Sequence, residues 1–482
     1  MTKKQKIESS PRKTETRELF DRIAPQRDAW INRNRFYYQD LWSYMRFLVP
    51  EGLKVLDLGC GTGRMLDAVK PSHGVGVDLS DSIIRIAKEN FPAHIFHQGN
   101  IEDPALIKKR GGPFDIIIIH DVLGMVDDCE EMLLSLHPLC TPETRIIIST
   151  YSYLWEPVLK LAEMFGLKMP TNPQNWLSPG NIENMLNLTD FELFKKERRL
   201  LMPKKLFGLG HLVNRFIGTL PGLRHFSLRN FIIARPMRNI EEKGLSTTVV
   251  VPCRNERGNI EAAVTRTPRF CKDMEILYVE GNSSDGTWEE IQRVIAAYPQ
   301  YDIKAIRQDG KGKGDAVRKA FDAARGDVLM ILDADLTMPP EDLPKFYRAL
   351  SSGKGQFING SRLVYPMDKQ AMRFLNYCAN HVFSWLFSWL LNQRFTDTLC
   401  GTKVLRKKHY EAIAHNRAYF GEFDPFGDFD LIFGAAKLNL KIIEVPIRYA
   451  DRTYGETQIS RFRHGLLLLR MVVFAYRKLK AF

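Results

Sequence analysis

Two aspartates, Asp333 and Asp335, follow the apolar run Val328–Leu332 with one residue between them. Carboxylates in this arrangement after a buried strand form a pair of hard oxygen ligands for Mg²⁺ or Mn²⁺, and a diphosphate can complete the coordination shell. The alternative for this pair is a capped turn before Pro339 and Pro340. We favour the metal site because polar motifs follow the neighbouring apolar runs as well.

Those motifs contain charged and polar residues that follow predicted strands or lie in a glycine-rich segment. They are Pro252, Asn255 and Glu256 after the run Thr247–Val251, Glu280 and Asp285 after the run Glu275–Val279, and Lys313 in the glycine-rich segment 310–316. The carboxyl ends of neighbouring parallel strands meet at one edge of a sheet, so we expect these residues to converge on one crevice. The Lys313 segment lacks the Gly-x-x-x-x-Gly-Lys-[Ser/Thr] pattern, which excludes a P-loop.

A glycine-dense turn follows the first apolar run of the other half of the chain. Gly59, Gly61 and Gly63 stand at alternate positions after Asp57. Glycine lets the backbone approach a ligand at positions where any Cβ would collide with it. A nicotinamide dinucleotide is disfavoured, because Arg64 occupies the place of the last glycine in Gly-x-Gly-x-x-Gly.

Asp78 ends the next apolar run and is followed by Leu79. An acidic residue at this position can accept hydrogen bonds from both hydroxyls of a ribose. The alternative is that Asp78 caps a helix that begins near Ser80. The glycine turn and the acid occur together in the expected strand order, which favours the ligand.

These residues need a sheet to position them. The strands predicted in the first half are Lys54–Leu58, Gly74–Asp78, His94–Gln98, Phe114–His120 and Arg145–Thr150, and those in the second half are Thr247–Val251, Glu275–Val279, Ile303–Ile306 and Val328–Leu332. Helical patterns such as Asp81–Asn90 and Asp128–Leu136 lie between them. This alternation predicts an α/β fold with a mostly parallel sheet flanked by helices in each half.

The chain has 482 residues, which corresponds to two or three domains. The charged segment Arg235–Gly244 contains a proline and a glycine. It follows a strand-like run, Phe231–Ala234, and precedes a new first strand, so we place a boundary there. We expect a first domain over 1–238, a linker over 239–245 and a second domain over 246–482.

Composition excludes several classes of protein. The hydrophobic share of 44% and the charged share of 26% are typical of globular domains rather than disorder. Seven scattered cysteines without a Cys-x-x-Cys pair argue against a disulfide framework or a structural zinc site. The segment Met1–Arg17 has no apolar core and no run reaches the length of a membrane span, so we expect a cytoplasmic location.

Residues 50–150 resemble the class I S-adenosylmethionine (SAM)-dependent methyltransferases, which have a Rossmann-like fold. The resemblance implies that the methionine part of SAM lies at Asp57, Gly59, Gly61 and Gly63, its ribose at Asp78 and Leu79, and its adenine between Asn100 and Ile101. Asp121 would lie at the edge that faces the substrate. His120 is a candidate general base, with a structural role as the alternative, and residues 151–228 would select the methyl acceptor.

Residues 247–482 resemble the family 2 glycosyltransferases of the dolichol- or polyprenyl-phosphate sugar transferase type, with a GT-A type nucleotide-sugar domain. The resemblance implies a nucleoside-diphosphate sugar at Pro252, Asn255, Glu256, Glu280, Asp285, Lys313 and Asp333, and a metal ion at Asp333 and Asp335, with Asp335 also catalytic. It places Arg362, Arg452 and Arg461 at the acceptor or its phosphate. Gln458 stands where the family has a phosphate-binding Lys, and Arg461 or Arg463 could replace that charge.

Two acceptor classes stay open. A phosphate acceptor is already an anion and needs only cations, whereas a hydroxyl needs a carboxylate base, for which Asp428 or Asp430 is placed as in the family. The aromatic run Phe374–Leu391 and the basic segment 460–482 suit the inner face of an anionic membrane, although the first can also pack on its own domain.

The sequence therefore predicts a bifunctional enzyme. It would transfer a methyl group from SAM and, with Mg²⁺ or Mn²⁺, a sugar from a nucleoside diphosphate to a polyprenyl-phosphate or glycan acceptor, in envelope glycan or glycolipid biosynthesis. The alternative is a glycosyltransferase with a non-catalytic SAM-binding regulatory module. The net charge of +13 is not tied to a recognition motif, so no nucleic acid partner is expected.

Overall fold

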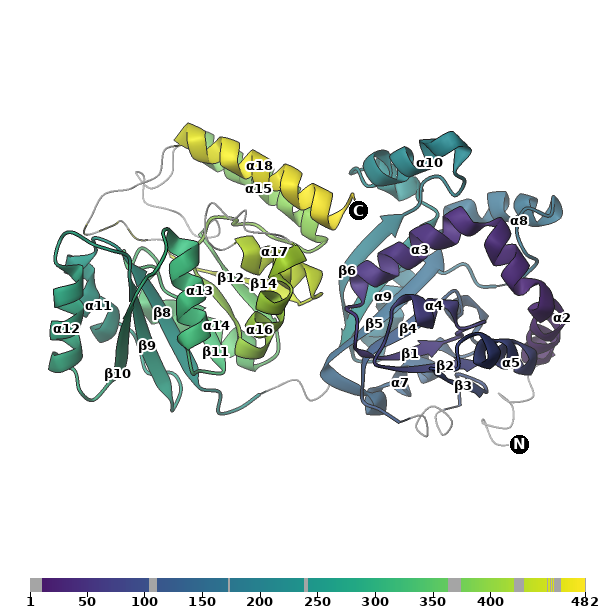
Figure 1. The fold of residues 1–482 in the computed structure, drawn as a ribbon, viewed down its shortest axis with the longest axis horizontal. Coiled ribbons are helices and arrows are strands. Elements are labelled where there is room, and N and C mark those ends of the chain that lie inside the picture. Colours follow the sequence, from purple (N-terminus) through teal and green to yellow (C-terminus); the bar gives the residue numbers. More distant parts are fainter. Residues whose placement is uncertain are drawn as a thin grey trace. The chain divides into compact units, whose positions relative to one another are not determined.

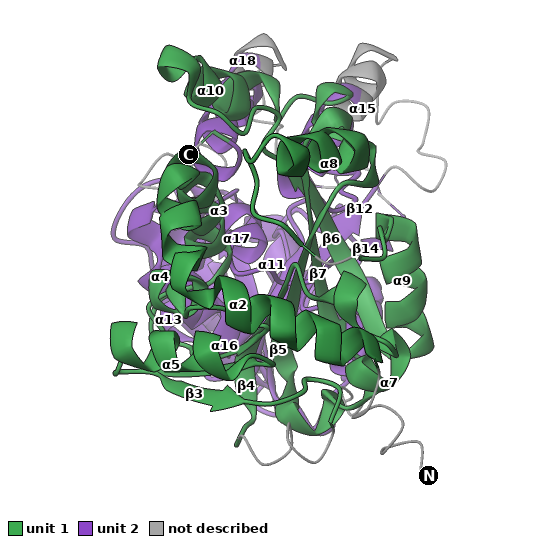
Figure 2. Cartoon of the chain, turned by 90° about the vertical axis from the view of Figure 1, so that its right-hand side faces the viewer, with its two compact units in different colours: residues 1–240, 481 green, residues 241–480, 482 purple. Residues whose placement is uncertain are grey.

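A seven-stranded sheet lies at the centre of each half of the chain in the computed structural model (Figure 1). The structure describes residues 11–103, 111–171, 174–237, 242–362, 374–419, 429–448, 450, 452, 454 and 461–481, without the side chains of 374–381 and 461–465. The chain divides into two compact units, residues 1–240 and 241–480 (Figure 2). We call them unit 1 and unit 2.

The sheet of unit 1 has the strand order β3-β2-β1-β4-β5-β7-β6. Its strands are β1 (Lys54–Leu58), β2 (His73–Asp78), β3 (Ile95–Gln98), β4 (Phe114–His120), β5 (Cys140–Tyr151), β6 (Phe191–Arg199) and β7 (Arg229–Pro236). β1 to β5 pair in parallel, whereas β7 runs antiparallel to both β5 and β6. The strand order reverses between β1 and β4, and ligands bind outside the carboxyl ends of strands at such a point.

Helices cover both faces of this sheet, because its central strands are apolar throughout. Ile116 to Ile119 of β4 are all at most 3% exposed. The helices of unit 1 are α2 (Pro11–Arg33), α3 (Arg35–Leu48), α4 (Arg64–Ala68), α5 (Asp81–Asn90), α7 (Cys129–Leu134), α8 (Glu156–Met164), α9 (Pro179–Leu188) and α10 (Leu209–Leu212). Ser80 caps α5 by accepting a hydrogen bond from the Ile83 amide, so this helix begins directly after β2.

The sheet of unit 2 has the strand order β10-β9-β8-β11-β13-β12-β14. Its strands are β8 (Thr247–Cys253), β9 (Met274–Glu280), β10 (Asp302–Arg307), β11 (Val328–Ile331), β12 (Phe357–Ser361), β13 (Lys403–Arg406) and β14 (Ile442–Pro446). All pairs are parallel except those of β13 with β11 and β12. The order reverses between β8 and β11, which carry the nucleotide and metal motifs.

The helices of unit 2 are α11 (Ile260–Thr265), α12 (Thr287–Ala297), α13 (Lys313–Ala323), α14 (Leu343–Ser351), α15 (Phe374–Leu391), α16 (Lys407–His415), α17 (Phe429–Lys437) and α18 (Arg461–Leu479). α15 and α18 lie side by side, and the rings of Trp389 and Tyr476 stack with centroids 5.6 Å apart (Figure 1). Phe387 of α15 is fully buried against Phe429 and Phe433, whereas Trp385 is 58% exposed. Part of the aromatic run therefore packs within its own unit.

The predicted fold class is confirmed. Each predicted strand is present, and β1, β4 and α5 have the predicted bounds. The strands β6, β12, β13 and β14 were not predicted. None of the helices in the described parts of the chain combines the length and the apolar character that crossing a bilayer requires.

Candidate active sites

The glycine turn of unit 1 connects β1 to α4 in a left-handed conformation. Gly59, Gly61 and Gly63 have φ values of +80°, +54° and +82°, which side chains rarely adopt. A Cβ at Gly59 would lie 3.0 Å from Val122, and one at Gly61 would lie 3.0 Å from the Arg27 guanidinium. The turn therefore needs glycine both for its backbone and for its surroundings.

Asp57 lies beneath this turn without a counter-charge. The residue is fully buried, and neither carboxylate oxygen has a hydrogen-bond partner among the described residues. Burial, and to a smaller extent the nearby Asp78, raises the pKa of Asp57 to about 7. A buried acceptor pair of this kind favours a ligand that is cationic or rich in N–H groups.

Asp78 shapes the turn from the end of β2. Its carboxylate accepts hydrogen bonds from the amide N–H of Gly61 at 2.9 Å and from that of Ser80 at 3.1 Å. Burial raises its pKa, although these amides and the Arg27 guanidinium oppose the shift. The capping role that we weighed for Asp78 thus belongs to Ser80, and Asp78 holds the glycine turn against β2.

A cavity of about 430 Å³ opens above the carboxyl ends of β1, β2 and β4. Eight of the nine residues predicted to bind the cofactor line it: Asp57, Gly59, Gly61, Asp78, Leu79, Asn100, Ile101 and Asp121. The ninth, Gly63, directly precedes α4, and a Cβ at this position would collide with Phe96. The glycine turn and the acids after β1, β2 and β4 therefore meet at one site, as predicted from the strand order.

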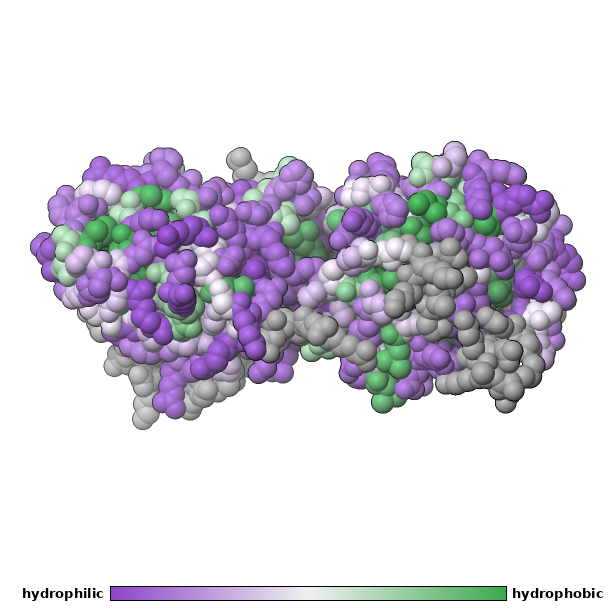
Figure 3. All heavy atoms as spheres, turned by 90° about the horizontal axis from the view of Figure 1, so that it is seen from below, coloured by the Kyte–Doolittle hydropathy of each residue, from purple (hydrophilic) through white to green (hydrophobic). Residues whose placement is uncertain are grey.

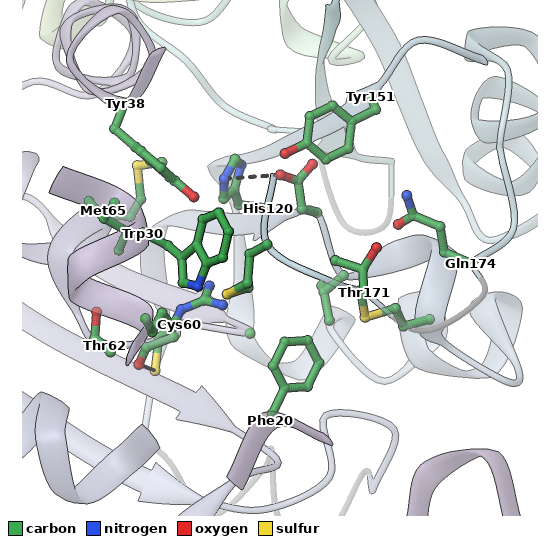
Figure 4. Close-up of a pocket in the computed structure, with 18 of the residues that line it drawn as sticks. Phe20, Trp30, Tyr38, Cys60, Thr62, Met65, His120, Tyr151, Thr171 and Gln174 are labelled. Carbon is green, nitrogen blue, oxygen red and sulfur yellow. Dashed lines mark hydrogen bonds and ion pairs between the residues drawn. The ribbon is translucent and has the colours of Figure 1, made fainter. Parts of the chain in front are cut away.

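Two N-terminal helices that carry no recognisable motif form the opposite wall of this cavity. Phe20 and Trp30 of α2 and Tyr38 of α3 point into the same space as His120 and Tyr151 (Figure 4). We did not predict this wall. Its aromatic side chains show only as an unremarkable helical pattern in the sequence.

Carboxylates of α2 fasten that helix to the sheet edge. Asp28 accepts hydrogen bonds from the Thr62 hydroxyl at 3.0 Å and from the Arg64 side chain at 2.9 Å. Asp21 accepts a hydrogen bond from the Ser80 hydroxyl at 2.5 Å. The residues that flank the glycine turn thus hold the helix that covers the turn.

A fully buried arginine organises the floor of the cavity. The side chain of Arg229 in β7 is 1% exposed and donates hydrogen bonds to Asp121 at 2.7 Å, to the Tyr37 hydroxyl at 2.6 Å and to the Ser149 hydroxyl at 2.9 Å. Its guanidinium also lies over the Tyr151 ring at 4.7 Å. We did not predict Arg229, because a single arginine in an apolar strand gives no motif.

The contacts of His120 define its tautomer. Arg229 can only donate, and its Nη2 lies 3.0 Å from His120 Nδ1, so Nδ1 is an acceptor. Burial lowers the pKa of His120 to about 4, which leaves the imidazole neutral with its proton on Nε2. Because Arg229 and Ser149 already occupy Nδ1, the structural alternative for His120 has the better support.

Asp121 has one carboxylate oxygen available as a hydrogen-bond acceptor, whereas the acceptor nitrogen of His120 is already occupied. Its Oδ2 accepts a hydrogen bond from Arg229, whereas Oδ1 is buried without a hydrogen-bond partner among the described residues. Burial opposes ionisation of Asp121, but the charge and hydrogen bond of Arg229, together with His120 and Lys168, outweigh burial and lower the pKa of Asp121. An ionised acceptor thus borders the cavity next to the predicted SAM residues.

In unit 2, both aspartates after β11 are paired with cations. Asp333 Oδ1 lies 2.6 Å from Lys313 Nζ, and Asp335 Oδ2 lies 2.6 Å from Arg452 Nη2. Burial acts to raise the pKa of Asp333, but Lys313, together with Lys403 and Arg362, outweighs burial and lowers this pKa. A Cβ at Gly401 would overlap the Asp333 carboxylate, so glycine is required there. The structure thus brings Lys313, Asp333, Asp335 and Arg452 together.

The predicted nucleotide residues form a connected network at the ends of β8 and β9. Asn255, at φ +55°, receives a hydrogen bond on its side-chain oxygen from the Ser284 amide at 2.9 Å. Glu280 is 3% exposed, and its carboxylate accepts a hydrogen bond from the Ser283 amide. The carboxylate of Asp285 accepts a hydrogen bond from the Arg257 amide at 3.2 Å. Arg452 lies 3.8 Å from Glu256 and connects this network to the aspartate pair.

The residues predicted for the acceptor have different surroundings. Arg362 forms a two-pronged ion pair with the buried Asp397, at 2.7 and 2.8 Å. Asp430 lies 3.1 Å from Arg318 and 3.5 Å from Arg417, beside α16. Asp428 lies outside the described residues, and Arg461 begins α18 without a described side chain.

The chemistry of the donor set fits a divalent cation at the aspartate pair. Two adjacent carboxylates are hard oxygen ligands, and substrate phosphates usually supply further ligands to Mg²⁺. Among the described residues, no group of three or more His, Cys, Asp or Glu side chains could hold a metal alone. A metal here would depend on the diphosphate.

Each unit is similar to a family of transferases. Residues 29–196 match a methyltransferase domain family, and residues 248–413 match glycosyl transferase family 2. These matches confirm the two resemblances predicted from the motifs. The chain is a fusion of a methyltransferase-like domain and a family 2 glycosyltransferase-like domain.

Individual relatives cover one half each. A dolichol-phosphate mannosyltransferase from Pyrococcus furiosus is 29% identical over 49% of this chain and 64% of its own length. An undecaprenyl-phosphate 4-deoxy-4-formamido-L-arabinose transferase from an Enterobacter species is 25% identical over 45% of this chain and 63% of its own. The chain thus spans less than two thirds of either relative. A SAM-dependent methyltransferase structure from Thermotoga maritima is 18% identical, with a TM-score of 0.36, over 46% of this chain and 99% of its own.

Proposed function

We propose that unit 1 transfers a methyl group from SAM. The observation that carries this proposal is the cavity in which eight predicted cofactor residues surround the unpartnered Asp57 carboxylate. SAM carries an amino group and a sulfonium, and its positive charge suits a buried carboxylate. When bound, SAM supplies an electrophilic methyl group, and the residues of this chain hold and orient the two reactants.

The roles within unit 1 follow from the contacts. Asp57 and the glycine turn bind the methionine part, Asp78 and Leu79 the ribose, and Asn100 and Ile101 the adenine. Asp121 Oδ1 accepts a hydrogen bond from the methyl acceptor and orients its nucleophilic atom. Arg229 holds Asp121 in its ionised form. The alternative, a SAM-binding module without catalysis, gives no reason for this charged floor beside the cofactor residues.

We infer that unit 2 transfers a sugar from a nucleoside diphosphate to a polyprenyl-phosphate or glycan acceptor. The names of the two curated relatives support a polyprenyl phosphate. Asn255, Glu256, Glu280 and Asp285 bind the nucleoside, and Lys313 the diphosphate. A divalent cation at Asp333 and Asp335 would neutralise the leaving diphosphate.

Arg452, which lies beside Asp335 and Glu256, would hold the acceptor phosphate. Asp430 is a weaker candidate for a base, because two arginines already occupy it. Such acceptors belong to envelope glycan or glycolipid biosynthesis at the inner face of the membrane. We propose that both units act there.

One experiment tests both activities on the full chain. Binding of SAM is measured by calorimetry, and hydrolysis of a panel of nucleoside-diphosphate sugars is measured with Mg²⁺, with Mn²⁺ and with chelator. We expect SAM binding without added metal and sugar release only with metal. Absence of SAM binding would refute the role of unit 1, and sugar release in chelator would refute the metal site.

A further inference from the structure

Besides the cavity, unit 1 has an unusual surface, which is formed by two segments that flank the cavity. The first contains η3 (Tyr153–Trp155) and α8, and α8 has no buried residue at all. The second, residues 204–226, contains α10 and the turns around it. Both lie at the same end of unit 1 (Figure 1). We call the two segments together the apolar-basic surface.

Specific contacts join the two segments. The Trp155 indole N–H donates a hydrogen bond to the Phe226 carbonyl at 2.8 Å. Asn34, between α2 and α3, donates a hydrogen bond to the Leu167 carbonyl at 3.5 Å and accepts one from Lys204 at 2.9 Å. The apolar-basic surface is therefore one continuous surface.

Large apolar side chains on this surface extend into solvent. Met164 and Phe165 are each 69% exposed, Leu212 is 57% exposed, Phe226 is 61% exposed and Phe207 is completely exposed. Leu206 and Phe207 also have φ values of +38° and +54°, a strained backbone for bulky residues. Clusters of exposed apolar side chains mark interaction sites. The face of unit 1 drawn in Figure 3, seen from below Figure 1, is mostly hydrophilic.

The net charge of this surface is positive. Residues 200–237 contain no Asp or Glu, and Lys204, Lys205 and Arg215 are exposed among the apolar side chains. The two acids of α8 are each paired with a lysine, Glu156 with Lys160 and Glu163 with Lys168. Apolar side chains that insert among acyl chains, surrounded by Lys and Arg, suit a bilayer with anionic headgroups.

The cavity opens onto this surface. Val158 and Leu167 line the cavity and are 50% and 46% exposed, and Lys204 also lines it. The cavity is also lined by Trp155, Trp30 and Trp42, so its wall is apolar as well. A molecule held in a membrane could therefore reach the SAM site without crossing water.

We propose that the apolar-basic surface docks on an anionic lipid bilayer, and that the methyl acceptor of unit 1 is a membrane-resident amphiphile. This proposal rests on the methyl transfer proposed above. In the reaction, a lone pair on an oxygen or nitrogen of the amphiphile forms a bond to the methyl carbon. The carbon–sulfur bond breaks with its electrons remaining on sulfur, which becomes a neutral thioether, and the acceptor proton passes to solvent.

Vesicle co-sedimentation of the full chain tests the docking. We expect binding to phosphatidylcholine vesicles that contain phosphatidylglycerol, weaker binding without it, and weakening by salt. The double variant Phe207→Glu/Phe216→Glu should bind about tenfold more weakly or worse, because both side chains are exposed on this surface. Leu188→Glu, a matched change at an exposed leucine of α9, should bind as wild type does.

A variant of unit 2 distinguishes the alternatives. Leu469→Glu changes an exposed residue of α18 and should retain docking through unit 1. Loss of binding in Leu469→Glu with normal binding in the double variant would assign the membrane contact to unit 2 and overturn the proposal. A concentration-dependent dimer that the double variant abolishes would instead show a contact between copies, and it would also overturn the proposal.

SAM binding separates this proposal from the proposed function. Neither Phe207 nor Phe216 lines the cavity, so the double variant should bind SAM normally. With methyl-labelled SAM and vesicles of bacterial polar lipids, we expect label in the organic phase for wild type and Leu188→Glu, and at least tenfold less for the double variant. Chains that bind vesicles but not SAM would refute the methyl transfer alone, and equal labelling by all three proteins would refute docking as the route to the acceptor.

Discussion

Arg229 of β7 and Asp121, which directly follows β4, form a 2.7 Å ion pair beneath the cavity of unit 1, although the two residues are distant in sequence. The pair fixes the hydrogen-bonding state of its neighbours, because the arginine donates to His120, Ser149 and Tyr37 as well. The floor of the proposed methyl-transfer site is therefore a single charged unit, in which each member depends on the arginine.

We predict that Arg229→Met lowers the free energy of unfolding of unit 1 by about 3 kcal/mol or more, because it leaves a buried carboxylate without its cation. Denaturant unfolding followed by tryptophan fluorescence measures the change. Lys196→Met is the control, since Lys196 lies on the neighbouring strand and is exposed, and its loss should cost less than about 0.5 kcal/mol. Equal stability of the two variants would contradict the role given to Arg229.

Gly61→Val should abolish the SAM binding that we expect in the micromolar range. The added side chain would meet the Arg27 guanidinium and strain a backbone at φ +54°. Gly52→Val is a matched control, because Gly52 has φ +83° and nothing within 4 Å of its added Cβ. Calorimetry on both full-length variants separates the effect of backbone strain from the loss of space for the ligand. Unchanged SAM affinity in Gly61→Val would contradict the assignment of the glycine turn to SAM.

The raised pKa of Asp57 predicts a pH dependence. Without ligand, its folded-state pKa of about 7 lies above the ordinary value of 3.8, so its contribution to stability is fully present below pH ~4 and is lost as the pH rises through ~7. A cationic ligand prefers the ionised form, so SAM affinity should rise over the upper part of this window. Asp57→Asn should remove the Asp57 contribution from both profiles, measured by thermal unfolding and calorimetry. A variant with the wild-type slope would show that Asp57 does not titrate there.

In unit 2, Asp335→Asn should lower sugar-transfer turnover by about a hundredfold or more, with a smaller effect on nucleotide binding. Charge on the diphosphate develops mainly as the sugar bond breaks, so a metal ligand acts mostly at that step. Loss of Glu280 or Asn255, which hold the nucleoside, should first raise the Michaelis constant for the donor. Asp273→Asn, at an exposed position before the amino end of β9, should behave as wild type. Full activity of Asp335→Asn, or of wild type in chelator, would contradict the metal site.

Much of the fold, and the sheet edges that face the ligands, could be predicted from local patterns in the sequence. The apolar runs that end at Leu58, Asp78 and His120 are strands because β-branched and aliphatic residues fill both faces of a parallel sheet. Once their order was inferred, Asp57, Gly61 and Asp78 had to lie at the same edge. These residues can be recognised from the sequence because they belong to a motif. The motif is recognisable because it sets the local conformation of the backbone.

The rest could not be predicted, because it depends on contacts between distant elements. Arg229 functions only through partners on other strands and on α3, and nothing in its own segment distinguishes it from a surface arginine. Asp430 has the residue type of a base, but its partners Arg318 and Arg417 come from other parts of unit 2. The strands β12 to β14 are short and lie among loops, so their pairing is set by the finished sheet.

The way α2 is fastened over the glycine turn has a practical consequence for protein production. The family match begins at residue 29, whereas Phe20, Asp21, Arg27 and Asp28 precede it. An expression clone trimmed to the matched region would retain every glycine and acid of the recognised motif. It would nevertheless lack most of α2, including Phe20 of the cavity wall and the carboxylates of Asp21 and Asp28 that hold this helix in place, so its failure to bind SAM would be an artefact of the cloning boundary.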